Sequence, residues 1–154
     1  MKTLPFLFGS LLVAQAHVRY VDNICFQPSG NAAFIHIPAD MRLGLPFTAT
    51  LLGAEGTDAL FAIGLLGEPF LGGPPTPVAL EFFTGSIGQP QCLFYVTEFS
   101  AVAGIDPAGN STGSWTIPLN PLLLGAAVWV QGITVGANPL GWAFSMAAEC
   151  IVLP

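Results

Sequence analysis

Glycine and proline interrupt this chain about every ten residues. The 18 glycines and 14 prolines are spread along the whole sequence. They leave little room for a helix longer than two turns, because proline breaks a helix interior and glycine weakens it. The runs between them are short and rich in Val, Ile, Phe, Thr and Trp, the residue types that favour strands. We therefore expect an all-β fold.

Eight runs between these breaks have the composition of strands: residues 31–37, 47–52, 60–66, 78–83, 92–98, 114–119, 126–134 and 142–153. Eight short strands separated by turn residues predict a single antiparallel β-sandwich with Greek-key or jelly-roll-like connections. In the run 92–98, apolar side chains fall on both alternating faces, as in a strand near the middle of a sandwich. No linker or repeat divides the chain, so we expect one domain.

The first sixteen residues have the features of a secretory signal. Lys2 precedes an apolar stretch, and Ala14-Gln15-Ala16 is the small-x-small pattern that a signal peptidase accepts. We expect cleavage after Ala16 and an exported β-sandwich domain at 17–154. Neither the signal nor any later segment offers about 20 unbroken apolar residues, so we expect no membrane span and a secreted or cell-surface location.

The charge of the exported part excludes several partners. Without Lys2 it keeps nine acidic side chains and two arginines, Arg19 and Arg42, which is a net charge of −7 (2 − 9). Nucleic acid and anionic membranes need clustered Lys and Arg to neutralise phosphate. We therefore expect neither as a partner.

The scarcity of charge favours self-association. Only 8% of the residues are charged, against about 25% in an average soluble domain. Without lysines the sheet edges lack their usual protection against pairing with other chains. The segment 17–26 alternates like a strand and could pair with a neighbouring subunit, which predicts a homo-oligomer or a filament.

The histidines do not favour a metal site. Cleavage after Ala16 would make His17 the N-terminus, and one class of copper enzymes uses such a histidine together with a second one. The other histidine, His36, lies between Ile35 and Ile37, so its side chain should point away from the core. No GxSxG nucleophile motif is present either. We expect no cofactor, with His17 and His36 as the remaining metal candidates, and no enzymatic activity.

A glycan-binding platform is the main alternative. Trp115, Trp129 and Trp142 are candidates to stack on a sugar, as tryptophan does in many exported sandwiches. By alternation Trp129 shares a face with Gln131, and an aromatic ring beside an amide suits a sugar.

Three cysteines, Cys25, Cys92 and Cys150, enter an oxidising compartment if the chain is exported. One disulfide with one cysteine left over is then expected, and three single bridges are possible. No CxxC or CxxH pair is present to start a zinc site.

The order of several motifs resembles a secreted β-sandwich module that is frequent in planctomycete-type bacteria. The resemblance covers about residues 25–153 and rests on Gly30-Asn31, Cys92 with Tyr95, Asp106 to Gly109, Trp115 with Ile117-Pro118, Leu124-Gly125 with Trp129 and Gln131, and Asn138 to Gly141. It implies the sandwich fold and no catalytic activity.

The resemblance also implies a disulfide between Cys25 and Cys92, because members of that family usually carry one early cysteine and one that opens the central strand. Cys150 is additional in this chain. Since the first and last strands of a sandwich can be neighbours, a bridge between Cys25 and Cys150 remains an alternative.

Taken together, these features predict an exported structural or interaction protein of the cell surface or extracellular matrix that associates with itself. A glycan-binding module is the alternative, and a copper-binding or oxidative enzyme with an N-terminal His17 is the third.

Overall fold

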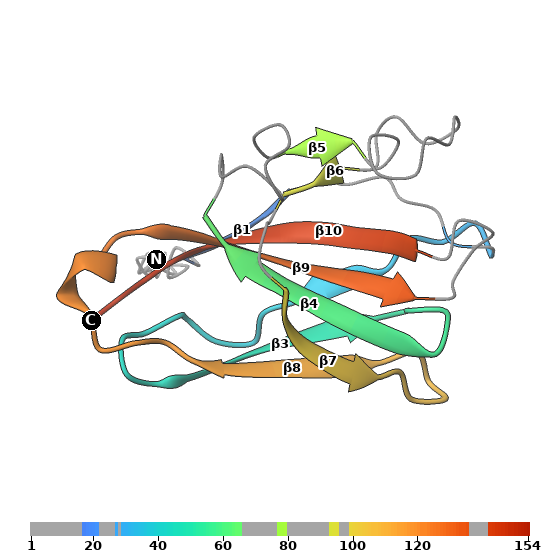
Figure 1. Ribbon diagram of the computed structural model, residues 1–154, viewed down its shortest axis with the longest axis horizontal. Helices are drawn as coiled ribbons and strands as arrows, with labels where there is room; N and C mark the ends of the chain where they lie inside the picture. Colours follow the sequence, from blue (N-terminus) through green and yellow to red (C-terminus); the bar gives the residue numbers. More distant parts are fainter. Residues whose placement is uncertain are drawn as a thin grey trace, which may run out of the picture.

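The strands form two stacked antiparallel sheets and a small third layer (Figure 1). The computed structural model describes residues 17–21, 27, 29–65, 77–79, 93–95, 99–135 and 142–154. The five-stranded sheet has the order β1 (Val18–Val21), β10 (Trp142–Ile151), β9 (Ala127–Val135), β4 (Asp58–Gly64) and β7 (Phe99–Gly104). The three-stranded sheet has the order β2 (Phe34–His36), β3 (Pro46–Leu52) and β8 (Ser111–Thr116). The all-β sandwich of about eight strands is therefore confirmed.

The remaining described elements are short. Strands β5 (Val78–Ala79) and β6 (Leu93–Phe94) pair with each other over the outer side of the five-stranded sheet, away from the three-stranded sheet (Figure 1). A 3-10 helix, η1 (Pro121–Leu123), lies in the connection from β8 to β9. No helix among the described residues is long and apolar enough to cross a membrane.

Four antiparallel strand pairs are nested within one another along the sequence. Strand β1 pairs with β10, β3 with β8, β4 with β7 and β5 with β6, all antiparallel. The pairs β9–β10 and β4–β9 join these into the larger sheet. Nested antiparallel pairs are the arrangement of a jelly roll, one of the two forms expected from the sequence.

The five-stranded sheet is buried on both faces. Toward the three-stranded sheet, Phe61, Val130 and Ala148 pack with Ile35 and Leu51 in the larger core. Toward β5–β6 lies a second, smaller core, which consists of Ala62, Tyr95, Trp129, Ile133, Phe144 and Ala147. Strand β9 therefore places alternate residues in two different cores, which explains why its sequence AVWVQGITV is mostly apolar and carries no charged residue.

A β-bulge in β10 keeps two side chains in the smaller core. The register shifts between Phe144 and Ala147, so both contribute to the same core although their spacing in sequence would place them on opposite faces. The hydroxyl of Ser145 accepts a hydrogen bond from Gly132 N–H (2.9 Å). The bulge is thus stabilised by a side-chain bond in the interior of the sheet.

Strand β1 pairs with β10 of its own chain. Its register runs from Val18 opposite Cys150 to Val21 opposite Ala147, and Arg19 forms an ion pair with Glu149 (2.7 Å). The Tyr20 hydroxyl accepts a hydrogen bond from Ile37 N–H (3.0 Å), which ties β1 to the end of β2. The part of the segment 17–26 that the structure describes therefore has a partner within the chain, whereas the sequence suggested a neighbouring subunit. Residues 22–26 and the expected signal, 1–16, lie outside the described residues.

Gly113 makes room for two aromatic rings in the larger core. A Cβ atom at this position would lie 2.6 Å from Trp115 Cη2 and 2.9 Å from Phe61 Cγ. We expect Gly113→Ala to lower the free energy of unfolding by about 1 to 3 kcal/mol through overpacking. Gly104→Ala is the matched control, because nothing lies within 4 Å of its added methyl group. Urea unfolding followed by tryptophan fluorescence measures both, and equal stabilities for the two variants would contradict this packing.

Asp106 organises the turn between β7 and β8. Its Oδ1 accepts hydrogen bonds from the backbone N–H of Asn110 (2.8 Å) and of Ala108 (2.9 Å). These bonds, that of Asn110 above all, lower the pKa of the Asp106 carboxyl below its ordinary value. Because this pKa is lower in the folded state, the ionised carboxylate stabilises the fold at pH values above the ordinary aspartate pKa of about 3.9. This stabilisation is lost as the pH falls through the lowered pKa.

We therefore expect Asp106→Ala to reduce the urea midpoint at pH 7, and the gap from the unmodified chain to close as the pH falls below about 4. Asp58→Ala is the control at the same end of the sandwich, because the Asp58 carboxylate accepts from the Thr57 hydroxyl (2.9 Å) and not from these turn amides. A gap that stays constant between pH 7 and pH 3 would show that the carboxylate charge is irrelevant to the turn.

Candidate functional site

The two residues of the expected glycan platform do share a face, but they are buried. Trp129 is 4% exposed and Gln131 is fully buried. The Tyr95 ring stacks on the Trp129 ring, with centroids 5.1 Å apart and planes 4° from parallel. The ring face that a sugar would need is thus already covered within the chain, so the pair provides no surface platform in this structure.

Gln131 anchors the segment 93–95 to the five-stranded sheet. Its Oε1 accepts a hydrogen bond from Tyr95 N–H (3.0 Å), and its Nε2 donates to the Leu93 carbonyl (2.9 Å) and to the Ser145 carbonyl (3.0 Å). An amide that uses all of these groups inside a core has a structural role. Trp115 packs at an angle against Phe47 and Phe61, and the side chain of Trp142 lies outside what the structure describes.

The histidines lie on different sheets. The His17 carbonyl accepts a hydrogen bond from Ile151 N–H beside β1, and His36 pairs with Thr50 between β2 and β3. His36 is exposed between the buried Ile35 and Ile37, as the alternation predicted. In the described ranges, no three His, Cys, Asp or Glu side chains gather in a way that could hold a metal ion.

Cys150 is a free, buried thiol in the larger core. Burial, and secondarily the nearby charge of Glu149, raises the pKa of Cys150 to about 12. The thiol is therefore protonated at neutral pH and is not a nucleophile. The structure does not contain the alternative bridge between Cys25 and Cys150, whereas the bridge between Cys25 and Cys92 stays a prediction, because both residues lie outside the described ranges.

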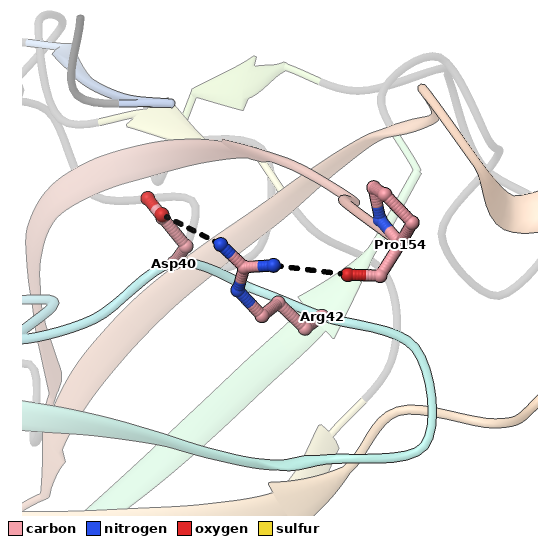
Figure 2. Close-up of polar contacts among 3 residues, drawn as sticks. All are labelled: Asp40, Arg42 and Pro154. Carbon is pink, nitrogen blue, oxygen red and sulfur yellow. Dashed lines mark hydrogen bonds and ion pairs between the residues drawn. The ribbon is translucent and has the colours of Figure 1, made fainter. Parts of the chain in front are cut away.

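Both arginines of the described chain are engaged. Arg19 pairs with Glu149, and Arg42 contacts the Asp40 carboxylate (3.8 Å) and donates to the Pro154 carbonyl (3.1 Å), as Figure 2 shows. The described surface therefore presents no unpaired arginine to an anionic partner.

The most unusual surface is the end of the sandwich at which η1 lies. Five leucines are exposed there, and we call this surface the apolar end; its members are Leu45, Leu65, Leu119, Leu122 and Leu124. Leu119 and Leu122 are 82% and 88% exposed. Single exposed leucines are common on proteins, but a group of them rimmed by polar surface marks a contact site.

The β8–β9 loop, which carries Leu119, Leu122 and Leu124, is held in place by hydrogen bonds. The Asn120 side chain accepts from Leu122 N–H (3.1 Å), and the backbone of η1 closes with Leu123 N–H to the Asn120 carbonyl (2.9 Å). Gly125 N–H donates to the Val152 carbonyl (2.9 Å), which ties the loop to the residues after β10. A fixed turn thus holds the apolar side chain of Leu122 in water, which is unfavourable in the free chain. Such an arrangement is typical of a binding surface.

An apolar cavity of about 250 Å³ opens beside the same leucines. Its walls come from β4 and β9, from η1 and from connecting residues next to the strands, and its lining is almost wholly apolar: Met41, Ile63, Gly64, Leu65, Ile117, Pro118, Leu123, Val128 and Val152. Leu123 turns into this cavity while the preceding Leu122 points to solvent. The apolar end therefore combines a protruding leucine with an apolar recess.

The opposite end of the sandwich is acidic. Glu55 lies there in the β3–β4 connection, Asp58 at the start of β4 and Asp106 in the β7–β8 turn. The connection and the turn are joined by the bond from Ala54 N–H to the Gly109 carbonyl (2.8 Å). No arginine lies among the described residues of that end. Glu55, Asp58 and Asp106 therefore lie at one end of the strands, and the exposed leucines lie at the other.

The sequence did contain a signal for the apolar end, although the leucines were not singled out. PLNPLLLG (118–125) places four leucines among proline, asparagine and glycine, which interrupt any strand. Consecutive apolar residues in a turn are expected to be avoided unless they have a function.

A scan against protein-family models found no match, and searches of curated proteins and of solved structures found none either.

We expect Gln131→Leu to lower the free energy of unfolding by about 2 to 4 kcal/mol, because it removes three buried hydrogen bonds. Thr134→Val on the same strand is the control, since it removes a single longer bond, from Thr134 Oγ1 to the Ala143 carbonyl (3.3 Å), and should cost less than about 1 kcal/mol. Amide hydrogen exchange at Tyr95 should accelerate in the first variant and stay unchanged in the second. Equal exchange in both would mean that Gln131 does not anchor this segment.

Proposed function

We propose that this chain is an exported, non-enzymatic structural or interaction protein of the cell surface or extracellular matrix, and that it associates with further copies of itself. The observation that carries the proposal is the apolar end, where Leu119 and Leu122 are held in solvent by a hydrogen-bonded turn. The secretory features of residues 1–16 and the motif order shared with the planctomycete-type module support the exported location.

The electrostatics support a copy of the chain as the partner. Among the described residues, the charged side chains nearest to the apolar end are paired, Arg42 with Asp40 and Arg19 with Glu149. Within the part of the chain that the structure describes, two copies that meet at this end bring no unpaired like charges together, although the exported chain carries a net charge of −7 (2 − 9).

The magnitudes predict weak association. Burying one leucine contributes about 1.5 to 3 kcal/mol, so two leucines from each of two copies contribute roughly 6 to 12 kcal/mol. The loss of translational and rotational freedom costs about 4 to 15 kcal/mol. The gain from leucine burial and the entropic cost of association are of similar size. We therefore expect reversible association, in which the fraction of associated chains depends on the protein concentration.

The alternative functions have less support. A glycan platform at Trp129 and Gln131 would need both side chains at the surface, and they are buried. A copper site at His17 and His36 would need residues that the fold holds on different sheets.

The test uses the full chain, produced in an exporting host and collected from outside the cells. We expect mass spectrometry to find His17 as the first residue, and sedimentation velocity to show a coefficient that rises with concentration. Replacing both Leu119 and Leu122 with Asp should leave a monomer, because charged side chains cannot be buried in an apolar contact.

Val102→Asp is the matched control, since Val102 is 71% exposed on β7, away from the apolar end. It should associate like the unmodified chain. A monomer at all concentrations for the unmodified chain would refute self-association, and retention of an uncleaved chain inside the cell would refute export.

A further inference from the structure

The apolar end contains two features that fit one another. Leu122 projects from η1 with 88% of its surface exposed, and the cavity beside it is open and apolar. An apolar cavity of about 150 Å³ is enough to hold a benzene ring. The cavity here, at about 250 Å³, has room for an aliphatic side chain.

Both features are fixed before any partner arrives. The Asn120 cap and the bond from Leu124 N–H to the Pro121 carbonyl (3.1 Å) hold Leu122 outward. The cavity is built from core residues such as Met41, Ile117 and Val152. Association at this end therefore requires little ordering of the chain.

We propose that a second copy of this chain occupies the cavity, with Leu122 of each copy inserted into the cavity of the other across a two-fold axis. The proposal rests on the self-association proposed above and specifies its geometry. Protrusion and recess lie on the same end of one molecule, so a two-fold contact satisfies both at once.

The charge distribution favours this arrangement over a head-to-tail contact. Joining two apolar ends places the acidic ends, with Glu55, Asp58 and Asp106, as far apart as the two molecules allow. In a two-fold contact, Leu122 and the cavity of both copies are occupied. Assembly through this surface then stops at two copies, in contrast to the filament that the segment 17–26 suggested.

A bilayer is a weaker match for the same leucines. Protein segments that lie in a membrane interface usually combine apolar side chains with Lys or Arg and with Trp or Tyr. The described residues near the apolar end offer only Arg42 and Arg19, and both are engaged: Arg42 with Asp40 and Pro154, and Arg19 with Glu149.

The experiment separates the protrusion from the recess. Leu122→Ala removes the protrusion and leaves the cavity open. Leu65→Trp, at a rim position that is 43% exposed, fills the cavity and leaves Leu122 in place; Leu65→Phe is the milder second variant. Val102→Ala is the control on β7. Circular dichroism and urea unfolding confirm that each full chain is folded.

We expect sedimentation to show that each variant alone dimerises roughly 100-fold or more weakly than the unmodified chain, because both reciprocal contacts are lost. A mixture of Leu122→Ala with Leu65→Trp retains one contact, since the intact Leu122 of one chain enters the open cavity of the other. The mixed dimer should therefore be roughly tenfold or more tighter than either variant alone.

The contrary outcomes are distinct. A mixture no tighter than its components, or association unchanged in both variants, would overturn reciprocal insertion and leave self-association standing. A strictly monomeric unmodified chain would overturn both proposals. Leucine-dependent binding of that monomer to phosphatidylcholine vesicles would assign the apolar end to a membrane.

Discussion

Burial of the five-stranded sheet on both faces is the constraint on which the rest of the structure depends. Strand β9 lies between two cores, so neither of its faces can carry a side chain that needs water. Polar residues are tolerated there only with hydrogen-bond partners, as Gln131 and Thr134 have. The three-stranded sheet and the β5–β6 pair are therefore both needed to keep this strand from solvent, which accounts for the absence of charged residues from β9.

The positions of most strands follow from glycine and proline, because these residues are frequent in the connections between strands, although Gly113 and Gly132 lie inside β8 and β9. The expected runs at 47–52, 126–134 and 142–153 correspond to β3, β9 and β10. Strand β7 was missed, because FSAVAG is rich in alanine, serine and glycine and has little intrinsic preference for a strand. Its pairing with β4 decides its conformation, and a partner distant in sequence is not visible in a local pattern.

The candidate site was harder to predict than the fold for a related reason. Alternation correctly placed Trp129 and Gln131 on one face, but whether that face reaches solvent depends on the β5–β6 layer, which comes from another part of the chain. The exposure of Leu119 and Leu122 likewise depends on a turn closed by Asn120 and by contacts to the residues after β10. Exposure is a property of the assembled layers and not of a run of residues.

The nested pairing has a consequence for the order in which the chain folds. Strand β1 finds its partner β10 more than a hundred residues later, and contacts between such distant residues form slowly, because a long loop must first be closed. A chain that emerges from its N-terminal side thus has β5 and β6 available to each other well before β1 has a partner. Until β10 is synthesised, the backbone of β1 is free to pair with β10 of another molecule. We therefore expect exchange of β1 between copies to be the main folding error at high protein concentration.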